Sequence, residues 1–134
     1  MLRFAATHVR ADKSIVLAAV KADPTLIRFA SLELRSDKEV VMAAVEGDGA
    51  TLAHAGESLR ESRKVVYAAL MTAAEAFQHA SARMRDYRDL ALIAIEADGR
   101  MIAHASERLR GDKELVMTAL ETALSTGTTD GQTD

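Results

Sequence analysis

Apolar and small residues recur along the chain at a fixed interval of 25 positions, without an insertion. One column of equivalent positions is alanine throughout: Ala5, Ala30, Ala55, Ala80 and Ala105. Apolar residues stand three positions before these alanines (Leu2, Ile27, Leu52, Phe77, Ile102) and four after them (Val9, Leu34, Leu59, Met84, Leu109). A second alanine column follows 14 positions later: Ala19, Ala44, Ala69, Ala94 and Ala119. This period predicts about five repeat units, starting near residues 1, 26, 51, 76 and 101.

Each unit is expected to form two short helices. In the second unit the first helix should begin at Asp23-Pro24-Thr25, because Asp is a favourable N-cap and Pro suits the first helical position. It should end near Arg35, and Ile27, Ala30 and Leu34 have the spacing of one helical face. The second helix, around residues 40–45, is apolar on all sides and is therefore expected to be buried between neighbouring units.

The helix ends carry recognisable signals. The sequence Ser36-Asp37-Lys38-Glu39 has the capping-box pattern, and Gly47-Asp48-Gly49 suggests a left-handed glycine cap that ends the second helix. The residue after each central alanine is always small, which would let another helix approach closely: Ala6, Ser31, Gly56, Ser81 and Ser106.

A buried strand is the alternative for the apolar segment around residues 40–45, and it would give a solenoid like that of leucine-rich repeats. Frequent alanine and the upstream capping box favour the helix. Because helices of about ten residues are unstable alone in water, the units must stack. The predicted fold is therefore an all-α domain, a short α-solenoid with helices about 8–10 Å apart.

Three irregularities interrupt this pattern. The first unit is incomplete, since its first helix would start at or near Met1. The segment 71–76 lacks the glycine breaker, so residues 64–84 form either a turn or one continuous helix. Residues 125–134 are polar and low in complexity, which predicts a disordered tail after a repeat domain of residues 1–124.

Composition narrows the functional classes. The chain has 49% apolar and 28% charged residues, a net charge of −3 and no cysteine. These values are typical of a globular domain in a reducing compartment such as the cytoplasm, and they exclude disulfides and cysteine-bound metals. No apolar run approaches the roughly 18 residues of a membrane span. Because the chain begins in repeat sequence, no signal peptide is expected.

The segment from Phe29 to Val45 resembles a known repeat family. It is similar to the repeats of domain of unknown function 4116, which read approximately Ala-Ser-x-x-Leu-Arg-x-Asp-Lys-Glu-Val-Val followed by Ala-Val. The segment from His104 to Leu120 matches similarly, and the resemblance covers residues 1 to about 122. Other units depart from the pattern at Ser14, Ser62 and Tyr87. The resemblance implies helical repeats and brings no activity, because the family is uncharacterised.

Three histidines share one column: His54, His79 and His104, with Phe4 and Phe29 in the same column of the first two units. Zinc needs ligands that converge to about 2.0–2.1 Å from the ion, whereas successive units lie on the order of 10 Å apart. The alternation with phenylalanine favours rings packed at a half-buried edge, and a pH-sensitive contact is a further possibility. No metal or other cofactor is expected.

Two basic columns are predicted to form a ridge at the turn between the helices. The first is Arg10, Arg35, Arg60, Arg85 and Arg110, and the second is Lys13, Lys38, Arg63, Arg88 and Lys113. Their structural role would be to cap carbonyl groups and to pair with neighbouring acids. Their functional role would be to bind an acidic protein or a phosphate backbone. Lysine at a helix N-terminus opposes the helix dipole, so its recurrence needs an explanation.

No nucleophile, base and acid stand in a triad-like order, and no glycine-rich phosphate loop occurs. We therefore expect a non-catalytic module that binds another protein. Binding of an anion or nucleic acid by the ridge is an alternative, as is inhibition of a larger enzyme. A partner would meet the outward positions that vary between units: Arg28, Leu32, Glu33, Glu57, Ser58, Gln78, Arg83, Glu107 and Arg108.

Overall fold

The computed structural model describes the backbone of residues 7–131 and the side chains of residues 9–125. Over this range every regular element is an α-helix or a 3-10 helix, and there is no strand. The strand alternative for the apolar segment is therefore wrong. The predicted helix start at Met1 lies outside the described residues.

The described units are built from a long α-helix, a 3-10 helix and a single helical turn. The long helices are α2 (Lys13–Ala22), α4 (Lys38–Gly47), α6 (Arg63–Leu70), α7 (Arg88–Ala97) and α9 (Lys113–Gly131). The 3-10 helices are η1 (Pro24–Phe29), η2 (Gly49–His54), η3 (Ala74–His79) and η5 (Gly99–His104). Single helical turns precede the long helices: α1 (Thr7–Arg10), α3 (Leu32–Arg35), α5 (Glu57–Arg60), the 3-10 turn η4 (Met84–Asp86) and α8 (Glu107–Arg110).

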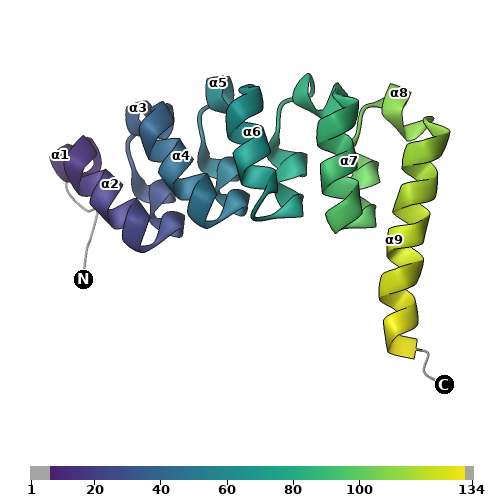
Figure 1. Cartoon of the computed structure of the whole chain (residues 1–134). Helices are drawn as coiled ribbons and strands as arrows, with labels where there is room; N and C mark the ends of the chain where they lie inside the picture. Colours follow the sequence, from purple (N-terminus) through teal and green to yellow (C-terminus); the bar gives the residue numbers. More distant parts are fainter. Residues whose placement is uncertain (1–6, 132–134) are drawn as a thin grey trace.

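The long helices lie side by side in chain order, and the short helices α1, α3, α5 and α8 lie at one end of them (Figure 1). Each long helix contacts the next, and η1, η2, η3 and η5 form a second row with contacts between neighbours. The core lies between the two rows. Among the described residues it contains both alanine columns together with Ile27, Leu52 and Phe77 of one apolar column and Val16, Val41, Val66 and Ala91 of another.

In the second to fifth units the first helix is not continuous, contrary to prediction. It is interrupted after η1, where Ala30 (φ −72°, ψ 160°) and Ser31 (φ −63°, ψ 160°) are extended. The reason is a hydrogen bond to the preceding unit, since the Ser31 N–H donates to the Arg10 carbonyl over 3.0 Å. The equivalent residues at positions 56, 81 and 106 donate to the carbonyls of positions 35, 60 and 85 over 2.8, 3.0 and 3.1 Å. The small-residue column therefore joins consecutive backbones.

Two predicted helix ends also differ from the structure. Asp37, not Ser36, is the N-cap of α4, and its carboxylate accepts hydrogen bonds from the Glu39 and Val40 N–H groups. No glycine among the described residues has a positive φ, so the left-handed cap at Gly47-Asp48-Gly49 is wrong. After α4, the chain turns at Asp48, which is extended and caps η2 through the Ala50 N–H.

The glycine at position 49 is explained by close packing. A Cβ atom added to Gly49 would lie 2.0 Å from the Ala69 carbonyl oxygen of the next unit. Van der Waals contact requires roughly 3.5 Å between such atoms. Any side chain at this position would therefore push η2 away from α6.

The chain turns at residues 71–73, so the alternative of one continuous helix over residues 64–84 is wrong. Helix α6 ends at Leu70 and η3 begins at Ala74. No aspartate caps the next helix at this turn, and Thr72 provides polar contacts instead. Its Oγ1 accepts a hydrogen bond from the Gly49 N–H over 2.6 Å and lies 3.0 Å from the Val45 carbonyl oxygen. The turn is thus stabilised by the preceding unit rather than by a local breaker.

The long helices, which are the predicted second helices of the units, are not buried on their outer face. One column remains partly or largely exposed along the outer face of the long helices: Leu17, Met42, Tyr67, Leu92 and Met117. The expected burial between neighbouring units therefore does not extend to this column, because no described residue covers the outer face of the row of long helices.

Helix α9 extends beyond the row of the other long helices (Figure 1). It continues to Gly131, so residues 125–131, which we predicted to be disordered, are helical. In three of the other units an aspartate (Asp23, Asp48 or Asp98) ends the long helix and caps the next element. The equivalent residue here is Ala123, which cannot do so. Residues 132–134 lie outside the described residues.

Replacing Gly49 by alanine tests the close contact with Ala69. Because the added Cβ meets backbone, we expect Gly49→Ala to lower the free energy of unfolding by about 1–3 kcal/mol. Gly111→Ala is the matched control, since its nearest atom would be 3.6 Å away, and it should change stability by less than about 0.5 kcal/mol. Urea unfolding followed by circular dichroism measures both, and equal losses would refute the packing explanation.

Candidate functional site

The arginine column lies at the junction between units, where its guanidinium groups donate to backbone carbonyls. The Arg10 Nε donates to the Phe29 carbonyl over 2.8 Å, and the Arg85 Nη1 donates to the His104 carbonyl over 2.9 Å. Within its own unit the Arg85 Nε donates to the Ala80 carbonyl over 3.1 Å. Arg110 does the same with Ala105 over 3.2 Å. These contacts hold the extended break and the next unit together.

Arg35 and Arg60 depart from this pattern. Their Nε atoms are buried without a hydrogen-bond acceptor among the described residues. Their backbone carbonyls still accept the N–H groups of Gly56 and Ser81. At the second and third units the backbone link is therefore kept, while the Nε link seen for Arg10 and Arg85 is missing.

The second basic column forms ion pairs with the following unit. The Lys13 Nζ lies 3.1 Å from Asp37 and 3.0 Å from Glu39. Arg88 pairs with Asp112 over 2.9 Å and also with Glu114. The acids lie 24 and 26 positions after the base. This explains why a base recurs at a helix N-terminus: it pairs with the N-terminal acids of the next helix.

Arg63 contacts both an acidic side chain and an aromatic ring. It pairs with Asp89, and its guanidinium carbon lies 5.0 Å from the centre of the Tyr87 ring. The bond from Arg63 lowers the pKa of Asp89, just as the bond from Arg88 lowers the pKa of Asp112. The tyrosine that interrupts the family pattern is therefore part of the same junction.

Lys38 is the one base of the second column that faces a following described unit without an ion pair among the described residues. The two positions that hold acids after Lys13 and Arg88 are occupied here by Ser62 and Lys64. Within the described part of the chain, neither Lys38 nor Lys64 forms an ion pair. Ion pairs to the following unit therefore neutralise three bases of the predicted ridge, Lys13, Arg63 and Arg88, whereas the junction between α4 and α6 has no such pair among the described residues.

The histidine column is half-buried and lies beside the arginine column. Burial lowers the pKa of His54, and the charges of Arg35 and Arg28 lower it further. Burial also lowers the pKa of His79; Glu75 opposes this effect, while Arg60 and the two other histidines of the column add to it. The surroundings of His54 and His79 therefore favour the neutral form of these two rings.

The part of the chain with described side chains contains no group of three or more histidine or acidic side chains that could hold a metal ion. No described helix combines the length and apolar character needed to cross a bilayer. The variable positions predicted to meet a partner are exposed in every case: Arg28, Leu32, Glu33, Glu57, Ser58, Gln78, Arg83, Glu107 and Arg108.

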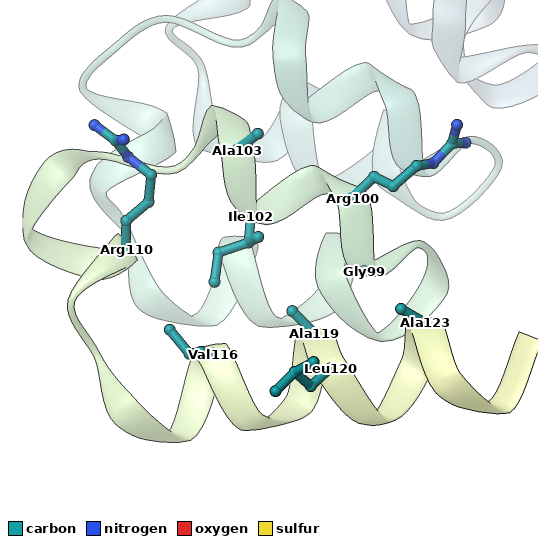
Figure 2. A pocket seen from close by; sticks show the side chains of 9 residues that line it. All are labelled: Gly99, Arg100, Ile102, Ala103, Arg110, Val116, Ala119, Leu120 and Ala123. Carbon is teal, nitrogen blue, oxygen red and sulfur yellow. The ribbon is translucent and has the colours of Figure 1, made fainter. Parts of the chain in front are cut away.

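An apolar groove at the C-terminal end of the row was not predicted. It is lined by residues of η5 and α9, including Ile102, Val116, Ala119 and Leu120 (Figure 2). The sequence does contain a signal for it, because Val116 and Leu120 belong to columns that are apolar in every unit. The period alone predicts the same burial for every unit, whereas the last unit of a row has a neighbour on one side only.

Comparison with known proteins identifies one family. The model for Domain of unknown function (DUF4116) matches three times, over residues 12–60, 37–85 and 87–125. The matches together span most of the chain, and overlapping hits agree with a repeated sequence. No curated protein and no solved structure matches.

The ion pairs between units can be tested with two matched substitutions. Arg88→Gln should lower the melting temperature at low salt, because Asp112 and Glu114 lose their partner. The difference from wild type should narrow in high salt, which screens exposed charges. Lys38→Gln should leave the melting temperature unchanged or raise it, since Lys64 stands at the facing acid position. Equal destabilisation by both substitutions would contradict the assignment.

The histidines predict a separate pH dependence. Because the folded state lowers the pKa of His54 and His79, it binds fewer protons than the unfolded chain as the pH falls below about 6.5. The contribution of these two histidines to the free energy of unfolding should therefore decrease from pH 7.5 to pH 5.5 and level off below their folded-state pKa values. The double variant His54→Phe/His79→Phe should lose this part of the dependence. Urea unfolding at a series of pH values measures it, and an unchanged slope in the variant would be the contrary result.

Proposed function

We propose that this chain, which belongs to the family described as domain of unknown function (DUF4116), is a non-catalytic α-solenoid that binds another protein. Its regular columns are used in packing and in bonds between units. The observation that supports the proposal is that all nine variable outward positions are exposed. In repeat domains, extended surfaces of this kind serve as binding faces.

The binding face is best defined around the second unit. Leu32 is 74% exposed, which is unusual for a large apolar residue with no role in the core. Beside it in the chain, the Arg28 guanidinium carbon lies 4.6 Å from the centre of the exposed Phe29 ring. An apolar residue next to an arginine and an aromatic ring is typical of protein interfaces.

A non-catalytic role is supported by the contacts of the polar residues. The arginines bind backbone carbonyls, and most bases of the second column bind acids of the next unit, so the chemistry of these groups is used within the scaffold. The absence of cysteine fits a reducing compartment, and we place the protein in the cytoplasm. Inhibition of a larger enzyme would use the same face.

Binding of an anion or nucleic acid is the second candidate. It is favoured by the junction between α4 and α6. Lys38 lies in α4 and Lys64 lies in α6, and neither lysine forms an ion pair with a described residue. Phosphate contacts by lysine would make such binding strongly dependent on salt. Arg85 is a poor probe of this activity because its side chain bonds to two carbonyls.

The protein-binding proposal is tested by affinity capture with quantitative mass spectrometry, using wild type and two matched variants. Leu32→Glu should remove the specific partner, because it places a charge at the centre of the proposed face. Tyr67→Glu is the control, since it makes a similar change at an exposed residue on the outer face of the long helices. The proposed face would be rejected if both variants reduced capture of the partner equally, or if neither variant reduced it.

A polyanion column tests the second candidate function, binding of an anion or nucleic acid. Retention on a polyanion column at low salt, lost in Lys38→Glu/Lys64→Glu and kept in Leu32→Glu, would favour anion binding over protein binding.

A further inference from the structure

The C-terminal end of the row leaves an apolar surface open. Figure 2 shows Ile102 of η5 directed toward the side of α9 that carries Val116 and Leu120. Val116 is 36% exposed and Leu120 is 50% exposed. Ala119, between them on the same helix, remains buried in the core. These side chains form an apolar groove between the two rows.

Equivalent positions in the other units show what normally covers this groove. The four residues equivalent to Val116 are completely buried: Val16, Val41, Val66 and Ala91. Those equivalent to Leu120 are at most 4% exposed: Val20, Val45, Leu70 and Ile95. In each of these units the following unit supplies the cover, because consecutive long helices and consecutive 3-10 helices are in contact. The groove therefore has the composition of the contact between units.

The last residues of this chain do not supply that cover. Continuing the period, the positions that carry Ile27, Ala30 and Leu34 in the second unit would fall at Gly127, Asp130 and Asp134. Helix α9 instead continues along its own axis beyond the ends of the other long helices (Figure 1). Residues 123–134 therefore lack the apolar residues with which a following unit would fill the groove.

The first unit presents the complementary surface. Ile15 is only half-buried, whereas its equivalents Val40 and Val65 are completely buried by the preceding unit. Ala18 is exposed, whereas its equivalents Ala43 and Ala68 are half-buried. The face of α2 that would meet a preceding unit is therefore open.

Charges at the two ends are also complementary. At two of the four internal junctions a base pairs with an acid 24 positions later: Lys13 with Asp37 and Arg88 with Asp112. At the C-terminal end the base of this column is Lys113, and no described unit comes after it in the row. At the N-terminal end the acid of the matching column is Asp12. A second copy placed one unit further along would bring its Asp12 to Lys113.

We propose that the groove on α9 binds the first unit of a second copy of this chain, so that copies associate head to tail. The contact repeats the geometry of the internal junctions, with α2 of one copy beside α9 of the other. It is heterologous, since different surfaces meet, and it can therefore extend into longer assemblies or close into a ring. It lies on a different surface from the face around Leu32 and does not depend on it.

Sedimentation velocity of the whole chain over a range of concentrations tests this proposal. Wild type should show a sedimentation coefficient that rises with concentration. Leu120→Glu and Ala18→Glu should each remain monomeric, because each places a charge in one of the two contact surfaces. Both residues are exposed in the single chain, so neither substitution should disrupt the fold, and circular dichroism checks this.

Mixing the two variants gives the decisive result. Each variant keeps one intact surface, so an equimolar mixture should form a 1:1 dimer that cannot grow further. Lys113→Glu should weaken association of the otherwise unchanged chain, and Lys113→Arg should preserve it, since arginine holds this position in two internal units.

Three outcomes would overturn the proposal. Wild type could stay monomeric at every concentration. Alternatively, Ala18→Glu could associate as wild type does while Leu120→Glu does not, which would indicate a symmetric contact between two C-terminal ends. The mixture of variants could also remain monomeric although wild type associates. If the groove bound an unrelated protein instead of a second copy, wild type would stay monomeric at every concentration, which is the first of these outcomes.

Discussion

The contact between consecutive units is the interaction on which the whole structure depends. A helix of ten residues gains too few hydrogen bonds to be stable alone, and the side chains at positions such as Val41 and Val45 become fully buried only when neighbouring units cover them. The backbone reinforces this packing, because the residue after each central alanine donates its N–H to the arginine carbonyl of the preceding unit. That bond requires the residue to leave the helical conformation, so the break inside each unit results from the stacking. At Gly56 the approach is closest, because a Cβ atom there would lie 2.0 Å from the Ser36 hydroxyl oxygen.

The same constraint decides which conspicuous residues remain for function. The arginine and lysine columns suggested a binding ridge from sequence, yet Arg85 bonds to two carbonyls and Arg88 pairs with Asp112 and Glu114. Regularity therefore indicates a role between units, and a partner is better sought where regularity fails. Leu32 and Lys38 are such places: the first is a large apolar residue that contributes nothing to the core, and the second is a base whose acids are replaced by Ser62 and Lys64.

Much of the fold could be predicted from local sequence. The 25-residue period, the helical nature of the apolar segment and the cap at Asp23 are encoded in residues close to one another, and the structure agrees with them. The predictions from sequence were wrong where a residue far away in the chain decides the local backbone conformation. The break at Ala30 and Ser31 needs the Arg10 carbonyl, and the turn after Leu70 is held by Thr72 against Val45 and Gly49. Gly49 is required by the Ala69 carbonyl of the next unit rather than by a local left-handed turn. None of these partners is adjacent in the chain, so propensities could not reveal them.

A row of identical contacts always leaves two unequal ends, and the chemistry of those ends determines how the molecule behaves. Terminal units of repeat proteins commonly carry a polar outer face that keeps the domain soluble. Here the last unit keeps Val116 and Leu120 at positions that are apolar in every unit, although no described residue of the row covers them. A polar substitution at these two exposed positions would cost little packing energy, because the core beneath them is already closed by Ala119 and Leu115. Their apolar character is therefore not required by the fold of this unit alone, whereas a contact that repeats the internal junction requires it directly.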